Sequence, residues 1–158
     1  MAKETISFEL FFSTVASEHR SFVQELNRKL IELGCEAVIK EAKSGYTVSY
    51  QYKKKTIMNW VFRKSGILAR IYGDHAYRYE DTIAALPPEM QKRMTTSRDC
   101  KRYIDPAACS DMCVKGFVYT LNGITYKKCR NDGMFFPLTS ESAEYISRLV
   151  CDEIAARQ

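Results

Sequence analysis

Four cysteines in the second half of the chain have types and spacing that could bind a metal. Cys100, Cys109, Cys113 and Cys129 are separated by 8, 3 and 15 residues. Four thiolates complete the tetrahedral coordination of zinc and leave no position open for a substrate, which is the arrangement of a structural site. Only the spacing of Cys109 and Cys113 matches the short spacing common among zinc ligands. The sequence therefore predicts a structural zinc ion on these four cysteines.

Basic residues accompany the two outer cysteines. Nearby positive charge lowers the pKa of a thiol and so favours the thiolate that binds metal. It also offsets the net negative charge of a zinc ion held by four thiolates. These residues are Lys101, Arg102, Lys127, Lys128 and Arg130.

Two other interpretations of the cysteines stay open. Free cysteines are often small buried hydrophobic residues, and the cluster could be no more than that. A thiol–disulfide switch is the third possibility. Cys35, just after a predicted helix end, and Cys151, inside the last predicted helix, are expected to be thiols of the core.

Basic residues also recur along the predicted strands in the first half of the chain. If they share one face, they could bind the phosphates of a nucleic acid. A solvated surface is the plainer interpretation of the same charges. The residues are Lys53, Lys54, Lys55, Arg63, Lys64 and Arg70.

One of the two histidines could take part in acid–base chemistry. His75 follows Asp74 directly after the predicted sheet, whereas His19 is expected to be a partly buried packing residue on the apolar face of the first long helix. No motif for a nucleophile accompanies His75. A small enzyme with a pocket near His75 is therefore kept as an alternative.

The elements that must position these residues follow from hydrophobic periodicity. Apolar residues at helical spacing predict a helix over 17–33, and the stretch from Ile6 to Phe12 is expected to be a short helix before it. Strict alternation predicts strands, and the short turns between them require antiparallel pairing. The expected strands are 37–42, 46–52, 56–63 and 67–72.

The second half is expected to be more irregular. Helices are predicted over 77–85 and from Pro87-Pro88 to about Met94. Strands over 117–121 and 124–129 flank Asn122-Gly123, a pair typical of a tight hairpin. A last helix is capped by Thr139, and its expected inner face is Ala143, Ile146, Val150 and Ile154.

Composition bounds the class of protein. The 158 residues are 46% hydrophobic and 27% charged, which is typical of one globular domain. We expect an α+β fold, with a small antiparallel sheet flanked by helices, in three parts. These are a helix-sheet-helix core at 1–96, a cysteine-rich zinc-binding segment at 97–136 and a C-terminal helix at 137–158. No apolar run is long enough to span a bilayer, so we expect a cytoplasmic, reducing location without membrane contact.

The stretch of predicted strands resembles a known family. Gly45-Tyr46-Thr47-Val48-Ser49-Tyr50, then Thr56 to Lys64, then Ile71-Tyr72-Gly73, look like the strand meander of the YdhG-like family. The resemblance covers roughly residues 17–73. It implies a small bacterial α+β domain with a helix ahead of a curved antiparallel sheet, and it supplies no functional residue.

The sequence thus favours a non-catalytic binding or scaffold module with structural zinc. A nucleic-acid-associated module that uses a basic sheet face, or a small enzyme near His75, are the alternatives.

Overall fold

The computed structural model describes residues 8–42, 45–63, 66–103, 105, 107 and 116–158. Within these ranges the fold is α+β, as expected, with a five-stranded antiparallel sheet in the order β1-β2-β3-β4-β7 and a separate two-stranded sheet, β5-β6. The strands are β1 Glu36–Ala42, β2 Gly45–Tyr52, β3 Lys55–Arg63, β4 Gly66–Ile71, β5 Phe117–Leu121, β6 Ile124–Lys128 and β7 Phe135–Pro137. The helices are α1 Phe8–Thr14, α2 Ser17–Glu32, η1 Ala76–Arg78, α3 Glu80–Ala84, α4 Pro88–Thr95, η2 Lys101–Tyr103 and α5 Ala143–Arg157.

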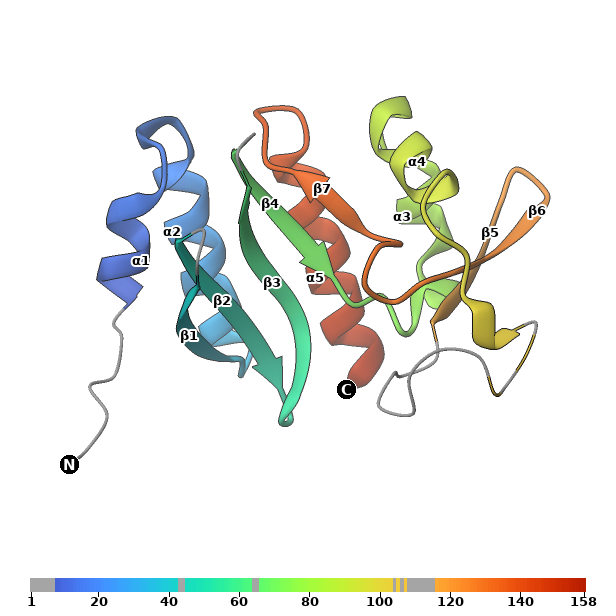
Figure 1. Cartoon of the computed structure of the whole chain (residues 1–158), viewed down its shortest axis with the longest axis horizontal. Helices are drawn as coiled ribbons and strands as arrows, with labels where there is room; N and C mark the ends of the chain where they lie inside the picture. The colour runs from blue at the N-terminus through green and yellow to red at the C-terminus, as the bar shows by residue number, and fades with distance from the viewer. Residues whose placement is uncertain (1–7, 43–44, 64–65, 104, 106, 108–115) are drawn as a thin grey trace.

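The large sheet and the long helices form two layers. Figure 1 shows the sheet in front of α2 and α5, with α3, α4 and the β5-β6 hairpin beside it. No helix in the described part combines the length and hydrophobicity that a bilayer span requires.

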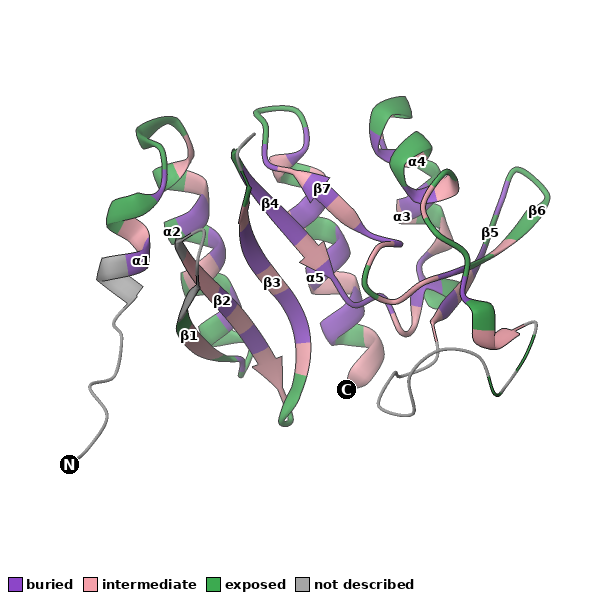
Figure 2. Cartoon of the chain, in the orientation of Figure 1, coloured by how far each residue is buried: buried purple, intermediate pink, exposed green. Residues whose placement is uncertain are grey.

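The core lies between the sheet and the helices behind it. Cross-strand pairs such as Val48–Trp60 and Tyr50–Met58 point to this side, and all four residues are fully buried. Burying one large apolar side chain contributes about 1.5 to 3 kcal/mol, so this layer holds most of the stabilising energy. Figure 2 shows the same buried stripe along β2, β3 and β4.

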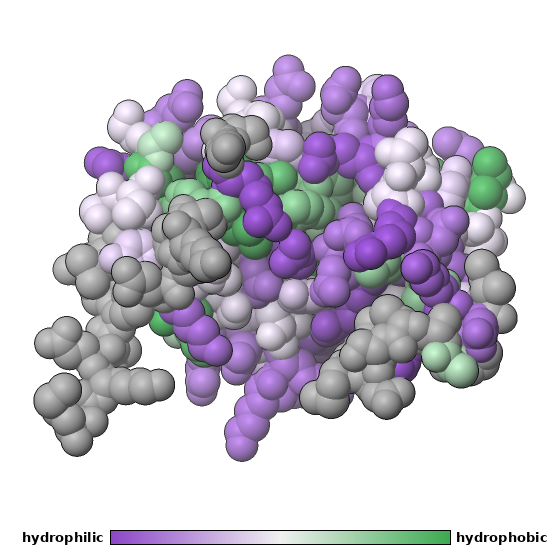
Figure 3. Space-filling model, in the orientation of Figure 1, coloured by the Kyte–Doolittle hydropathy of each residue, from purple (hydrophilic) through white to green (hydrophobic). Residues whose placement is uncertain are grey.

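The other face of the sheet is turned towards solvent. Figure 3 shows hydrophilic residues over most of it, around a hydrophobic area above the strands. Two arginines cover part of this area, because the guanidinium carbons of Arg63 and Arg70 lie 5.9 and 4.6 Å from the centre of the Phe135 ring.

The sequence analysis missed one strand. Phe135–Pro137 pairs antiparallel with β4 and extends the large sheet, although residues up to 136 were expected to belong to the cysteine-rich segment. Three residues ending in proline give no readable alternation, and proline is tolerated here because the strand lies at the edge of the sheet.

The helix predicted over 77–85 is interrupted. It consists of the 3-10 turn η1 and the short helix α3, separated by Tyr79. Tyr79 has φ −132° and ψ 42°, outside the helical region. This conformation directs its phenol into the interior, where it donates a hydrogen bond to Glu153.

The helix α5 begins one turn after the residue expected to cap it. Thr139 Oγ accepts a hydrogen bond from the backbone N–H of Ser142 at 3.0 Å, and Ser142 Oγ accepts one from the N–H of Thr139 at 2.9 Å. The expected inner face is confirmed for Ile146, Val150 and Ile154, all buried. The reciprocal bonds fix the direction in which α5 enters the core.

Two hairpins have the same two-residue connection but different residues in it. Asn122 and Gly123 join β5 to β6 with φ 52° and 79°, and Lys53 and Lys54 join β2 to β3 with φ 51° and 68°. Asparagine and glycine suit these left-handed angles, whereas a long side chain there costs about 1 kcal/mol or more per residue. The β2-β3 turn is therefore strained and the β5-β6 turn is not.

The double substitution Lys53→Asn/Lys54→Gly should raise the free energy of unfolding by about 1 kcal/mol, because it relieves this strain. Urea denaturation measures the change. The matched control, Asn122→Lys/Gly123→Lys, introduces lysines at left-handed positions and should lower the free energy of unfolding by a similar amount. A Cβ at Gly123 would have no neighbouring atom within 4 Å, so the loss would report backbone strain and not a steric clash. A Lys53→Asn/Lys54→Gly protein no more stable than the parent would contradict the assignment of strain.

Candidate functional site

The outer cysteines come together at a short β-bridge. Asp99 pairs antiparallel with Lys128, and the flanking backbone hydrogen bonds, made by the N–H groups of Cys100 and Cys129, are 2.9 and 2.8 Å long. Side chains alternate across such a pair, so Cys100 and Cys129 project to the same face in diagonal positions. The fold thus joins the two ends of the predicted zinc segment.

Each of the two sulfurs accepts a hydrogen bond. The backbone N–H of Gly116 lies 3.2 Å from Cys100 Sγ, and Arg98 Nη2 lies 3.8 Å from Cys129 Sγ. Cys100 is buried and Cys129 is half-buried. Both donors would stabilise a thiolate, and Arg98 is a cation that the sequence analysis had not associated with the cluster.

Cys109 and Cys113 lie outside the described residues. Among the residues that are described, no group of three or more His, Cys, Asp or Glu side chains is arranged to hold a metal ion. The convergence of all four sulfurs therefore stays a prediction.

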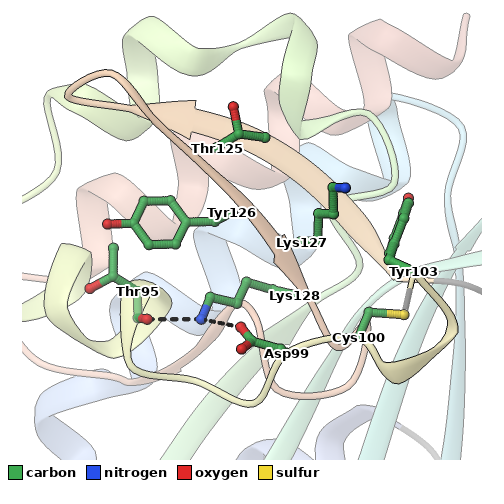
Figure 4. Close-up of a pocket in the computed structure, with 8 residues that line it drawn as sticks. All are labelled: Thr95, Asp99, Cys100, Tyr103, Thr125, Tyr126, Lys127 and Lys128. Atoms are coloured by element: carbon green, nitrogen blue, oxygen red, sulfur yellow. Dashed lines mark hydrogen bonds and ion pairs between the residues drawn. The ribbon is translucent and has the colours of Figure 1, made fainter. Parts of the chain in front are cut away.

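Lys128 serves a different purpose from the one expected of it beside Cys129. Its side chain is 5% exposed, and its ammonium donates to the carbonyl oxygens of Thr95 and Ser97 at 2.8 and 2.9 Å and pairs with Asp99 at 2.8 Å. Figure 4 shows Lys128 pointing to Thr95 and Asp99, away from Cys100. It ties the end of α4 to β6 and so holds the bridge that aligns the cysteines.

A pocket of about 520 Å³ opens beside this bridge. Cys100 lies in its wall together with Tyr103 and Lys127, whose ammonium is 5.6 Å from the centre of the Tyr103 ring. The pocket thus borders Cys100, whereas Cys129 is not among the residues that line it.

The two remaining cysteines behave as core thiols. Cys35 is buried, and burial, reinforced by the nearby Cys151, raises the pKa of its thiol to about 11. Burial also raises the pKa of Cys151. Both thiols therefore stay protonated near neutral pH and are poor metal ligands.

The described basic residues of the first half are spread along the sheet, and Arg70 on β4 pairs with Asn59 in the middle of β3. Lys53, Lys54 and Lys55 lie at the β2-β3 turn, whereas Arg63 ends β3 about 25 Å away, eight residues further along the strand. Arg70 shares the Phe135 ring with Arg63. Lys64 lies outside the described residues. The structure thus brings Arg63 and Arg70 together but not the whole set.

A second cluster surrounds Glu153, which the sequence analysis did not name. Its carboxylate is fully buried and accepts four hydrogen bonds. They come from the His75 backbone N–H at 3.0 Å, His75 Nδ1 at 2.8 Å, the Tyr79 hydroxyl at 2.7 Å and Arg157 Nε at 2.7 Å. Burial, and then the Glu153 charge, raise the pKa of Tyr79 far above its usual value, so the phenol keeps its proton and donates.

This arrangement orients the His75 imidazole. All other partners of Glu153 donate to it, so the carboxylate is ionised and the proton of the neutral ring belongs on Nδ1. Nε2 is then the nitrogen left for the pocket that His75 lines. A histidine held in this way can exchange a proton or a hydrogen bond with a ligand.

Two arginines connect this cluster with the Asp99–Lys128 β-bridge, which Cys100 and Cys129 flank. Arg130, next to Cys129, donates to Asp74 at 2.9 and 3.3 Å, and Arg157 donates to the same carboxylate at 3.1 Å. Arg157 also donates to the carbonyl oxygen of Tyr72 at 3.0 Å. The two candidate sites are therefore mechanically linked through Asp74.

One signal could have pointed to Glu153. It follows Val150 by three residues and Ile146 by seven, which places a charged residue on the apolar face of a helix. Such a residue is buried only with partners, and His75 and Arg157 are those partners.

Comparisons with protein families, with curated proteins and with solved structures find no match to this chain. The resemblance to the YdhG-like family therefore stays a prediction.

Replacing Glu153 by glutamine should lower the free energy of unfolding by about 3 kcal/mol, since it removes the buried carboxylate from Arg157 and leaves the half-buried Asp74 as its counter-charge. The control is Glu144→Gln on the same helix, whose exposed pair with Arg148 should contribute less than about 0.5 kcal/mol. Chemical denaturation compares the two proteins. Equal stability of the two variants would mean that Glu153 is not an essential ionic centre.

Proposed function

We propose that this protein is a non-catalytic binding or scaffold domain whose hairpin end is held by a structural zinc ion on Cys100, Cys109, Cys113 and Cys129. The observation that carries the proposal is the position of Cys100 and Cys129 on one face of the Asp99–Lys128 bridge. The proposal requires a reducing compartment, where thiolates persist.

The hairpin end has a physical need for such a clamp. A two-stranded sheet is marginally stable in water, and β5-β6 is paired with the rest of the described chain only through the single bridge at Asp99. Its inward residues Phe117, Tyr119 and Leu121 are buried, but β6 is mostly exposed. A four-thiolate zinc site contributes an apparent binding energy of about 10 kcal/mol or more, comparable with the stability of a whole domain.

The geometry at the sulfurs fits thiolate ligands. The Gly116 N–H bound to Cys100 and the Arg98 guanidinium bound to Cys129 both donate to sulfur. Gly116 is required for this approach, because a Cβ there would overlap the Lys128 carbonyl oxygen. The chain is thus shaped locally around Cys100.

Two other candidates are less well supported. A nucleic-acid-associated module needs the basic residues together on one face, and the described ones are spread along β3 and β4. A small enzyme beside His75 is the second candidate, favoured by the orientation of the imidazole by Glu153.

The zinc proposal predicts about one zinc ion per chain in protein purified without chelators, measured by elemental analysis. Cys129→Ser should lose the metal and destabilise the hairpin end, because the remaining thiolates cannot complete the tetrahedron. Each zinc–sulfur distance, measured by X-ray absorption, should be about 2.3 Å.

The matched controls are Cys35→Ser and Cys151→Ser, which change core thiols and should leave the zinc content unchanged. Zinc below about 0.2 per chain in the parent protein would overturn the proposal. Equal metal content in Cys129→Ser and Cys35→Ser would overturn the ligand assignment.

A further inference from the structure

A pocket at the end of the β2-β3 hairpin gathers cationic side chains from distant parts of the chain. Its volume is about 300 Å³. Lys53 and Lys55 reach it from the hairpin, Asp74 and His75 from the segment after β4, and Arg157 from the last turn of α5. A pocket at the small end of the range for ligands fits a small molecule and not a polymer.

The lysines are the uncompensated charges of this pocket. Asp74 is paired with Arg130 and Arg157, and Glu153 with His75 and Arg157. Neither Lys53 nor Lys55 forms an ion pair with any residue in the part of the chain that the structure describes. The two carboxylates and two arginines balance, so the pocket keeps a positive excess for a ligand.

The turn that carries Lys53 is strained. Lys53 and Lys54 occupy left-handed positions, for which the other hairpin of the same molecule uses Asn122 and Gly123. Strain retained in the backbone tends to occur at functional sites. The strained turn places Lys53 over the Tyr52 ring, with its ammonium 5.4 Å from the ring centre, at the edge of the pocket.

The carboxyl end of α5 acts against an anion, because it carries a partial negative charge. Arg157 lies in this last turn, and Arg78 donates to the Ala156 carbonyl oxygen at 3.4 Å. Arg78 offsets part of the charge at the helix end, whereas the charge of Arg157 is already balanced by its carboxylate partners. Lys53 and Lys55 therefore decide the sign of the net charge of the pocket.

From these observations we propose that the pocket binds a small phosphate monoester or inorganic phosphate. Lys53 and Lys55 attract the anion, and His75 Nε2 forms a hydrogen bond with it. Lysine binds phosphate as a point charge, and the arginine that lines the pocket, Arg157, is already occupied by Asp74 and Glu153.

The neutral imidazole suits the monoanionic form of a phosphate. A phosphate monoester loses its second proton near pH 6. While the phosphate keeps this proton, its hydroxyl donates to Nε2 of the neutral ring. The dianion has no proton to donate, so its binding depends on the two lysines. This site supplies a ligand for the binding role proposed above, and its test is separate from the zinc measurement.

The test is an NMR titration of the full chain at low ionic strength with inorganic phosphate and with phenyl phosphate. We expect saturable shifts of the His75 ring and of the amides of Lys53 and Lys55, with a dissociation constant of about 1 mM. Lys53→Ala/Lys55→Ala should weaken binding at least about tenfold. The control Lys92→Ala, an exposed lysine on α4, should bind like the parent.

Two further arms make the result decisive. Lys53→Asn/Lys54→Gly relieves the strain without disturbing the fold, but it also removes the Lys53 ammonium. It should therefore bind phosphate more weakly than the parent. Acetate should bind at least about tenfold more weakly than phosphate. The proposal is overturned if no saturable shift occurs by about 50 mM phosphate, if the double alanine variant binds like the parent, or if acetate binds as well as phosphate.

Discussion

The buried Glu153 carboxylate is the interaction on which the arrangement of this protein depends. A charge removed from water costs several kcal/mol unless hydrogen bonds and counter-charges replace the lost hydration. Here the segment after β4, the break between η1 and α3, and the last turn of α5 each supply a donor to the same carboxylate. Because those donors must converge on one carboxylate, they fix how α5 lies across the sheet and where the chain leaves the sheet after β4.

The same cluster links the two ends of the molecule. Arg157 joins Glu153 to Asp74, and Asp74 is held in turn by Arg130, which follows Cys129. Lys128, on the other side of Cys129, ties the bridge to the end of α4. The Asp99–Lys128 β-bridge is therefore anchored by Lys128 on one side of Cys129 and by Arg130 on the other. Both cations bind oxygen atoms and not the cysteine sulfurs. The cation that contacts the Cys129 sulfur is Arg98, which Asp132 also binds at 2.9 Å.

Much of the fold could be predicted from sequence where a local pattern carried the information. The alternation along 46–52 and 56–63 predicted β2 and β3, and the Asn122-Gly123 pair predicted the β5-β6 turn. The strand β7 was missed because three residues that end in proline show no period, and they become a strand only when β4 offers an edge. The helix expected over 77–85 is interrupted at Tyr79. The backbone there leaves the helical region and lets the Tyr79 hydroxyl donate to Glu153, which lies far away in the sequence.

The site was predictable to a smaller degree. Cysteine spacing predicted four metal ligands, and the fold places Cys100 and Cys129 beside one β-bridge, but Lys128 turns away from Cys100. The importance of Glu153 depends on partners from two other elements, which no local pattern reveals. The Lys-Lys turn looked like an ordinary polar connection, because its strain is a property of backbone angles and not of composition.

The central claim is that Glu153 is ionised and holds His75 with its proton on Nδ1. Long-range nitrogen–proton NMR correlation of the imidazole ring, recorded where the histidine is neutral, tests it most directly. The account predicts a protonated Nδ1 and an unprotonated Nε2. A ring protonated on Nε2 would contradict it, because Nδ1 could not then donate to the buried carboxylate.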